Sequence, residues 1–393
     1  MRRTAVVGAL LVLGLAACSD GGDEGPGPDT VTAPTGDESG DTGSPSPSAT
    51  RSRRGDGPDG SDGADGLTKG RPGVVVDTVA TGLEVPWGLG FLPDGRAVVT
   101  ERDTREVLLV DPLGGRPQTA GIVEQAVPAG EGGLLGVAVS PDFRRDRMLY
   151  FYATRAGDNA VLRAPLGRDD RLGAFEIVLD GIPRGFIHNG GRLRFGPDGM
   201  LYVSTGETGD GAQSQDRSSL GGKILRITPD GEPAPGNPDP DSPVWTWGHR
   251  NVQGLTFDDD GNLWASEFGQ STYDELNLIR EGGNYGWPQV EGRGDSGEFV
   301  DPQVVWSTSD ASPSGIAWAE GHVWLGALGG TRLWRVTIED GRASDPTAFL
   351  TGDHGRLRAV EVAPDGMLWV TTSNRDGRGI PEVEDDRILV VRP

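Results

Sequence analysis

The chain has 393 residues and carries 36 basic and 59 acidic side chains, which gives a net charge of −23. A field of this sign repels nucleic acid and anionic lipid surfaces, so neither is expected as a partner. A single cysteine excludes an internal disulfide framework.

The first 18 residues have the composition of an export signal. Two arginines precede an apolar run over residues 5–15, which is about five residues too short to span a bilayer. The run ends in Leu-Ala-Ala-Cys, which resembles a bacterial lipobox with Cys18 as the lipidated residue. We therefore expect an exported protein held at the outer face of the bacterial cell membrane by this anchor alone. The alternative is a chance cysteine in a signal that is cleaved elsewhere.

Residues 19–72 are rich in Gly, Ser, Pro, Thr and Asp and contain almost no large apolar side chains. Such a segment cannot bury enough surface to offset the entropy of its chain, so it is expected to be a disordered acidic tether. Residues 56–63 have a faint likeness to Gly-Asp calcium repeats, but a flexible linker has the same composition. The globular part is then residues 73–393.

A short pattern recurs along the globular part: a turn ending in Gly, or Phe at one site, followed by a β-branched or aromatic strand. The turns are Pro93-Asp94-Gly95, Pro141-Asp142-Phe143, Pro197-Asp198-Gly199, Asp259-Asp260-Gly261, Ala319-Glu320-Gly321 and Pro364-Asp365-Gly366. Their central acidic residues are separated by 48, 56, 62, 60 and 45 positions, close to the roughly 40 to 50 residues of one propeller blade. The six copies predict an all-β fold, a six-bladed β-propeller that forms one catalytic domain. Unrelated hairpins in a sandwich, the alternative, would usually turn every 8 to 12 residues or so.

Two dense polar motifs each contain a histidine. His188 lies in residues 186–193, a Gly-containing loop that leads into a predicted strand. A neutral imidazole can take a hydroxyl proton near pH 7, which makes His188 a candidate general base, with a structural role as the alternative. In residues 247–254, Arg250 offers donors for a carboxylate or an oxyanion, and Asn251 and Gln253 can orient a planar ligand. A solvated charged loop is the alternative for this second motif.

Two further motifs suggest binding sites, the first for a cation and the second for an anion. Residues 266–277 and 283–288 combine carboxylates, side-chain amides and Gly-rich backbone, which supply the oxygen ligands that Ca²⁺ prefers. No His or Cys set has zinc spacing. Arg356 and Arg358 alternate along an extended segment, so their side chains point to one face. Two adjacent guanidinium groups repel each other unless an anion joins them.

These four motifs, in this order, resemble the bacterial glucose/sorbosone dehydrogenase family, soluble aldose sugar dehydrogenases that use pyrroloquinoline quinone (PQQ). The likeness extends from about residue 83 to the C-terminus. It includes residues 86–87 with 91–95, residues 132–136 with 141–143, and residues 218–227. The resemblance implies a six-bladed propeller, in agreement with the count of turns.

The resemblance also implies roles for individual residues. His188 matches the base that removes the proton of the sugar C1 hydroxyl while a hydride passes to PQQ, and Arg250 matches the group that stabilises charge on the quinone oxygen. The positions that match cofactor contacts are Arg250, Asn251, Gln253, Arg356 and Arg358.

For calcium, the resemblance implies two sites. The backbone carbonyls of Gly269 and Gln270 match ligands of a catalytic Ca²⁺, which would polarise the quinone. Glu275 and the Tyr285 carbonyl match ligands of a second, structural Ca²⁺.

The chain departs from the family pattern at two positions. Gly329 stands where the family often has a lysine on the cofactor, and Arg332 is a candidate substitute for the lost charge. Glu131 stands where relatives commonly carry Gln. Its negative charge would weaken PQQ binding unless calcium or a proton neutralises it.

No Cys-x-x-Cys-His haem motif occurs in the sequence, so electrons from an aldose substrate are expected to pass to an external acceptor. Two other functions remain open on fold grounds. One is a calcium-dependent lactonase or esterase, because propellers of that kind also hold a central Ca²⁺. The other is a surface binding module that has lost the cofactor.

Overall fold

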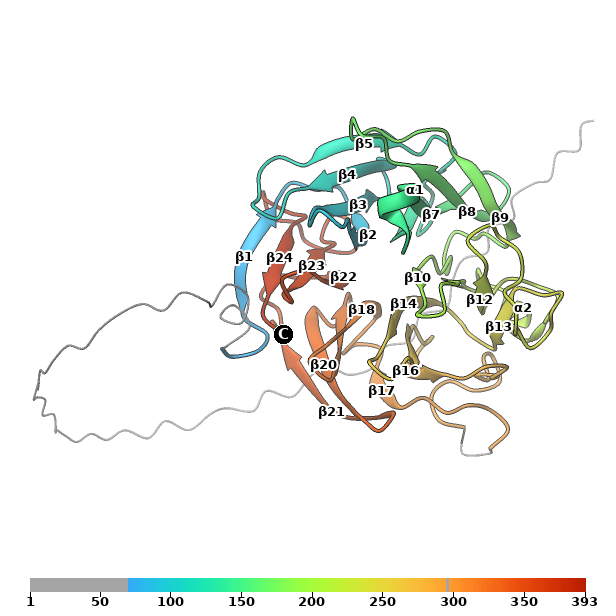
Figure 1. Ribbon diagram of the computed structural model, residues 1–393. Helices are drawn as coiled ribbons and strands as arrows, with labels where there is room; N and C mark the ends of the chain where they lie inside the picture. The colour runs from blue at the N-terminus through green and yellow to red at the C-terminus, as the bar shows by residue number, and fades with distance from the viewer. Residues whose placement is uncertain (1–69, 295–296) are drawn as a thin grey trace, which may run out of the picture. The chain divides into compact units, whose positions relative to one another are not determined.

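The computed structural model of the protein describes residues 70–294 and 297–393 (Figure 1). The predicted signal sequence, the lipidated Cys18 and the tether up to residue 69 lie outside the described residues. In the described part, no helix is both long enough and apolar enough to cross a membrane.

In the described part, the strands form six four-stranded antiparallel sheets, which are the six blades of a propeller. Blade 1 contains β2 (Pro86–Phe91), β3 (Ala97–Glu101), β4 (Glu106–Val110) and β5 (Gln118–Ile122). Blade 2 contains β6 (Leu134–Val139), β7 (Met148–Thr154), β8 (Asn159–Pro165) and β9 (Glu176–Ile182). Blade 3 contains β10 (Leu193–Phe195), β11 (Leu201–Ser204), β12 (Lys223–Ile227) and β13 (Val244–Trp247).

The second half of the chain repeats this plan. Blade 4 contains β14 (Val252–Phe257), β15 (Leu263–Glu267), β16 (Tyr273–Ile279) and β17 (Val304–Ser307). Blade 5 contains β18 (Pro313–Ala319), β19 (His322–Ala327), β20 (Arg332–Glu339) and β21 (Arg342–Phe349). Blade 6 contains β22 (Leu357–Val362), β23 (Leu368–Thr372), β24 (Ile388–Val391) and β1 (Val75–Ala80). The predicted six-bladed β-propeller is confirmed.

The ring of blades is closed by hydrogen bonds between the two ends of the described chain. In blade 6, β1 pairs antiparallel with β24, and Val75 lies opposite Val391. Figure 1 shows β1 in blue beside β24 in red. The N-terminal strand therefore completes the last blade and fixes the first blade against it.

Each of the six predicted turns joins the first and second strands of one blade. Five of them have a final glycine with φ between 76° and 93°, a conformation that disfavours residues with a Cβ. The turn that ends in Phe143 instead continues into the short helix α1 (Phe143–Asp146), and the Phe143 side chain is buried. The other short helix is α2 (Ala212–Gln215).

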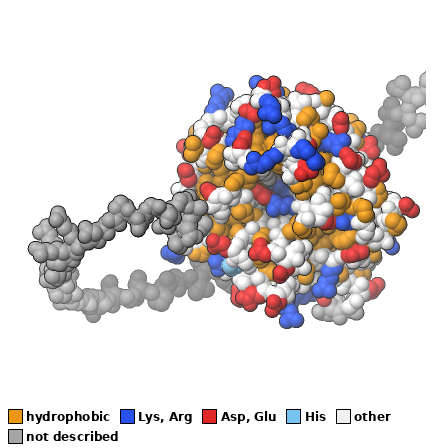
Figure 2. Space-filling model, viewed as in Figure 1, with side chains coloured by type: hydrophobic (Ala, Val, Ile, Leu, Met, Phe, Trp, Pro, Cys, Tyr) orange, Lys and Arg blue, Asp and Glu red, His pale blue; other side chains and the backbone are white. Residues whose placement is uncertain are grey.

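Because all six turns follow the first strands, they lie on one face of the propeller, which we call the turn face. The first strands begin at the other face, which we call the cavity face. Figure 1 shows β2, β10, β14, β18 and β22 nearest the axis and α1 in the foreground, so the view in Figures 1 and 2 is onto the turn face. Residues at the start of the first strands are thereby gathered around one mouth of the axial channel.

Buried hydrophobic side chains hold neighbouring blades together. They form six clusters in the described part, one in each gap between blades. Trp264, Trp324 and Trp369 belong to second strands and are at most 2% exposed. Burial of rings of this size is a major source of the stability of the ring.

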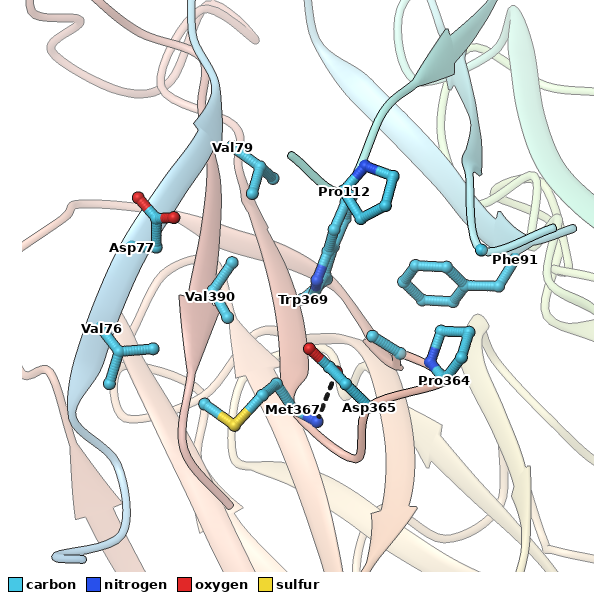
Figure 3. A pocket seen from close by; sticks show the side chains of 12 residues that line it. Val76, Asp77, Val79, Phe91, Pro112, Pro364, Asp365, Met367, Trp369 and Val390 are labelled. Atoms are coloured by element: carbon cyan, nitrogen blue, oxygen red, sulfur yellow. Dashed lines mark hydrogen bonds between the residues drawn. The ribbon is translucent and has the colours of Figure 1, made fainter. Parts of the chain in front are cut away.

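An apolar cavity of about 400 Å³ opens on the turn face between blades 6 and 1. Figure 3 shows Val79, Phe91 and Trp369 around it, and the Phe91 and Trp369 rings meet edge to face with centroids 5.0 Å apart. Asp365 in its wall accepts a hydrogen bond from the backbone N–H of Met367. The residues that line this cavity include no histidine and no arginine, so the predicted active-site residues lie elsewhere.

The close packing of blades 1 and 2 around Gly88 predicts a sensitive position. A Cβ at Gly88 would lie 2.6 Å from Thr100 Oγ1 and 2.8 Å from the Leu135 carbonyl oxygen, whereas a Cβ at Gly90 would have only an ordinary contact with Val139. We expect Gly88→Ala to lower the free energy of unfolding by about 1–3 kcal/mol, the usual effect of overpacking. Gly90→Ala in the same strand should change it by less than about 0.5 kcal/mol. Urea denaturation measures both, and equal effects would contradict the close approach.

Candidate active site

A polar cavity of about 260 Å³ lies at the axial mouth on the cavity face. Its walls include every residue predicted to contact the cofactor or the catalytic calcium: His188, Arg250, Asn251, Gln253, Gly269, Gln270, Arg356 and Arg358. These residues come from blades 3, 4 and 6, and ring closure brings them together. The structure thus brings His188 and the three predicted arginines together at one mouth of the channel.

Positive charge is concentrated in this cavity. Its lining contains five arginines but only two carboxylates, Glu131 and Asp274. Sequence analysis named three of the arginines and missed Arg102 and Arg378. In a protein with a net charge of −23, such a concentration of cations favours an anionic ligand.

His188 is oriented by a buried carboxylate. Its Nδ1 lies 2.5 Å from Oε1 of Glu207, and both side chains are largely buried. An ionised carboxylate can only accept a hydrogen bond, so Nδ1 carries the proton and Nε2 is the free acceptor of the neutral ring. The Glu207 N–H donates to the Arg250 carbonyl, which links the base to the neighbouring motif.

The His188 backbone is also fixed. Its φ is 54°, an uncommon conformation for a residue with a Cβ that is often found at functional sites. The His188 N–H donates to Oε2 of Glu131, and Arg378 Nη1 donates to Oε1 of the same carboxylate. Burial opposes the ionisation of Glu131, but these hydrogen bonds outweigh it and hold the pKa of Glu131 below its usual range. Arg378 therefore neutralises the additional charge that the sequence places at Glu131.

Arg250 keeps part of its hydrogen-bonding capacity free. Its backbone N–H donates to Glu267, its Nη1 lies 3.3 Å from the Phe268 carbonyl oxygen, and its guanidinium lies over the Trp287 ring. Its Nε is buried and has no partner in the described part of the chain. Burial lowers the pKa of Arg250, and nearby carboxylates oppose that effect. The side chain is suited to a ligand that brings an acceptor oxygen.

The two amide side chains predicted as cofactor contacts are buried beside Arg250. Asn251 Oδ1 accepts the Gly190 N–H at 3.0 Å, which fastens the loop that carries His188. Gln253 Oε1 accepts from Ser314 Oγ at 3.0 Å and lies 3.4 Å from Arg358 Nη1. Both amides therefore position their neighbours as well as line the cavity.

Arg356 and Arg358 are joined by an anion of the protein itself. Asp376 Oδ2 accepts from Arg356 Nε at 3.0 Å and lies 3.3 Å from Arg358 Nη2. All three side chains are nearly buried. Burial opposes the ionisation of Asp376, but the charges of Arg358 and Arg356 hold its pKa below its usual range. The sequence predicted that an anion joins the pair, and Asp376 provides one inside the protein.

The loop predicted to bind the catalytic calcium has a distinctive backbone. The N–H groups of four successive residues, 270–273, donate to Oε1 of Glu291, and the Gly269 N–H donates to Asp274. No hydrogen bond to the carbonyl oxygens of Gly269 or Gln270 occurs among residues 70–294 and 297–393. Gly269 and Gln270 both line the cavity, so these oxygens are suitable ligands for a hard cation.

The residues predicted to bind the structural calcium also converge. Glu275 and Tyr285 line a narrow gap of about 10 Å³ together with Glu267 and Glu291, which is room for one water or ion. Asn277 Nδ2 donates to both Glu275 and Glu267. Burial and then the charge of Glu267 raise the pKa of Glu275 to about 8. Within the described ranges, no group of three or more His, Cys, Asp and Glu has metal-binding geometry, so a cation here would need carbonyl ligands.

Comparison with known proteins identifies the family. Residues 83–383 match the family of glucose/sorbosone dehydrogenases. The chain belongs to this family. Aldose sugar dehydrogenase YliI of Escherichia coli K12 is 28% identical to it, covering 77% of this chain and 91% of the relative.

Two solved structures are similar over most of the chain. The PQQ-bound form of an aldose sugar dehydrogenase from Streptomyces coelicolor is 56% identical, with a TM-score of 0.80, and the match covers 81% of this chain and 97% of that chain. An oxidoreductase (glucose dehydrogenase) from Thermus thermophilus is 44% identical, with a TM-score of 0.75, covering 80% of this chain and 98% of that chain. The propeller of this chain is thus the fold of the glucose/sorbosone dehydrogenase family.

Gly329, one of the two positions expected to depart from the family pattern, lies close to the cavity wall. A Cβ at Gly329 would lie 2.5 Å from Oγ of Ser312, a residue of the cavity wall. A longer side chain at position 329 would therefore displace Ser312. Arg332 lies over the Trp334 ring, and its Nη2 is 3.4 Å from Asp310. Arg332 is not part of the cavity lining, so it is not placed to supply the charge of the lysine expected at position 329.

The residues that sequence analysis missed are mostly the carboxylates behind the functional side chains. Glu207 holds His188, and Asp376 holds the arginine pair. His249, in the second motif, is fully buried and bonds Glu267 through Nδ1 and Thr246 through Nε2, so both ring nitrogens are occupied. Only one signal in the sequence pointed toward Asp376: two neighbouring arginines, Arg356 and Arg358, need an anion between them.

The buried position of Asp376 predicts a pH-dependent contribution to stability. Its pKa is lower in the folded protein than the ordinary value of 3.8, so the stabilisation is present above about pH 4 and is lost as the pH falls through the folded pKa. We expect Asp376→Asn to lower the free energy of unfolding at pH 7 by about 3–5 kcal/mol, as for other broken buried ion pairs. The difference from the wild type should shrink at pH 3, which urea denaturation at the two pH values can measure.

The matched control is Asp310→Asn, which weakens the exposed contact with Arg332 and should cost less than about 1 kcal/mol. If Asp376→Asn were no more destabilising than this control, the role given to Asp376 would be wrong.

Proposed function

We propose that the protein is a PQQ- and Ca²⁺-dependent aldose dehydrogenase that oxidises the C1 hydroxyl of a sugar to the lactone. The observation that carries the proposal is the meeting of a carboxylate-oriented histidine with five arginines in one cavity. The similarity to the PQQ-bound aldose sugar dehydrogenase of S. coelicolor supports the choice of cofactor. A calcium-dependent hydrolase would leave the cluster of arginines without a purpose.

The cavity suits a tricarboxylate such as PQQ. Arg356 and Arg358 share Asp376 but keep further N–H donors, and the buried Nε of Arg250 has no partner in the described part. Burial lowers the pKa of Arg358 to about 9, so it remains charged at neutral pH. These arginines would hold the carboxylates of PQQ, with Asn251 and Gln253 beside them. When bound, PQQ would supply the acceptor for the hydride from the sugar.

Three side chains of the protein would assist the transfer of the proton and the hydride. His188 Nε2 would take the proton of the C1 hydroxyl, because Nδ1 is engaged with Glu207. Arg250 would stabilise negative charge that develops nearby. Glu207 keeps the imidazole in the required tautomer and orientation, as carboxylates do in other histidine-dependent sites.

Calcium would use the backbone oxygens described above. The Gly269 and Gln270 carbonyls would bind the catalytic Ca²⁺, a Lewis acid in the cavity. Glu275 and the Tyr285 carbonyl would bind a second, structural Ca²⁺, whose charge would offset the repulsion between Glu275 and Glu267.

We further propose that the protein is exported and anchored through Cys18 to the outer face of the cell membrane. The composition of residues 1–18 supports this location. The chain has no Cys-x-x-Cys-His haem motif, so an external acceptor would receive the electrons.

The proposal predicts that purified apoprotein will reduce an artificial dye with an aldose only when both PQQ and Ca²⁺ are supplied. His188→Ala should lower kcat by about 10²- to 10⁴-fold, the usual contribution of a general base. It should still bind PQQ, because the arginines and the calcium ligands are unchanged. Steady-state dye reduction and a PQQ titration measure the two effects separately.

His322→Ala is the control, since His322 lies beside a turn on the turn face and should leave kcat unchanged. If the loaded wild type failed to reduce the dye but opened a lactone, the hydrolase function would replace the proposed one.

A further inference from the structure

A second polar cavity lies on the propeller axis, toward the turn face. It has a volume of about 300 Å³ and is lined by residues of the first strands of blades 1, 2, 3, 4 and 6, including Leu89, Val137, Leu255 and Glu361. Basic side chains are visible near the centre of this face in Figure 2. None of the residues predicted to contact PQQ or calcium lines this cavity, so it is distinct from the candidate active site.

Arg192 is the most deeply buried charged group in the wall of this cavity. Only 8% of the residue is exposed. Its guanidinium carbon lies 4.4 Å from the centre of the Trp87 ring, and its Nε donates to the Gln253 carbonyl at 2.8 Å. Its Nη2 is buried and has no hydrogen-bond partner in the described part of the chain.

No carboxylate within residues 70–294 and 297–393 forms an ion pair with Arg192. The acidic residue in the cavity wall is Glu361, and Arg194 Nη1 already pairs with it at 2.5 Å. Burial lowers the pKa of Arg192 to about 10, which leaves the side chain charged at neutral pH. The charge of Glu361 favours the ionised form of Arg192 but forms no ion pair with it. A buried charge without an ion-pair partner is unfavourable, so a mobile counter-ion in the adjoining space would stabilise the fold.

The walls of the cavity indicate which kind of anion fits. Apolar side chains such as Leu89, Val137 and Leu255 provide no donors to replace the hydration shell of a multiply charged oxyanion. Because Arg194 is paired with Glu361, Arg192 leaves the wall with one unmatched positive charge, which suits a single negative charge. We propose that this axial cavity is a binding site for a small, weakly hydrated monovalent anion of the chloride class, held by Arg192.

Two residues of the active-site cavity contact Arg192, although neither lines the axial cavity. Trp87 lines the active-site cavity and stacks with Arg192, and Gln253 accepts from Arg192 through its carbonyl while its side chain lies near Arg358. An anion on Arg192 would therefore help to fix the floor of the active-site cavity. The proposal itself does not depend on the identity of the redox cofactor.

Bromide is the probe for the test. Crystals of the wild-type protein grown without halide and soaked in sodium bromide should show an anomalous peak in the axial cavity, at hydrogen-bond distance from the Arg192 guanidinium. The peak should be lost in Arg192→Gln and kept in Arg332→Gln, whose arginine lies outside both cavities. In solution at constant ionic strength, bromide should raise the Tm of the wild type and of Arg332→Gln, but not that of Arg192→Gln.

The location of the peak decides the result even if Arg192→Gln does not fold. Anomalous density restricted to the active-site cavity, or only water beside the Arg192 guanidinium in the axial cavity of the wild type, would overturn the proposal.

Discussion

The pairing of β1 with β24 is the constraint on which the rest of the structure depends. It closes six separate sheets into a ring, so that all six first strands begin at the same mouth of the axis. Side chains as distant in sequence as Trp87 and Arg378 can then line one cavity. No single blade contains the site. If the ring opened, His188 and Arg358 would move apart even without a change in the conformation of either residue.

The second organising feature is the way in which an acidic protein keeps several arginines close together. Asp376 lies between Arg356 and Arg358, and Glu131 holds Arg378, so repulsion within the group is reduced without filling the cavity. Glu207 plays the corresponding part for His188. The functional side chains are thus held by buried carboxylates and still have donors or acceptors left for a ligand. Arg192 and Arg250 are exceptions, because no carboxylate in the described part of the chain forms an ion pair with either guanidinium.

Much of the fold and of the cavity could be predicted from the sequence, because both depend on short local patterns. A Pro-Asp-Gly turn restricts its own backbone, and six copies at blade spacing determine the architecture. His188, Arg250 and Arg358 lie in dense motifs that stand out in an otherwise acidic chain. Their supporting carboxylates could not be found in this way. Glu131 and Arg378 are 247 positions apart, and nothing local to either residue specifies the other. The helix α1 was missed because the turn expected at Pro141-Asp142 continues into it, and the burial of Phe143 at its start is a tertiary effect.

The central claim is that the arginines of the cavity bind an anionic redox cofactor, and the affinity for PQQ tests it most directly. PQQ would be titrated calorimetrically into wild-type apoprotein and into Arg358→Gln in the presence of Ca²⁺, with Arg332→Gln as the charge-matched control outside the cavity. The account predicts that Arg358→Gln weakens binding by about 10-fold or more, the loss expected for a charge-assisted hydrogen bond of 1.5–3 kcal/mol or so. Arg332→Gln should bind as the wild type does. Equal Kd values for all three proteins, or no binding of PQQ to the wild type, would contradict it.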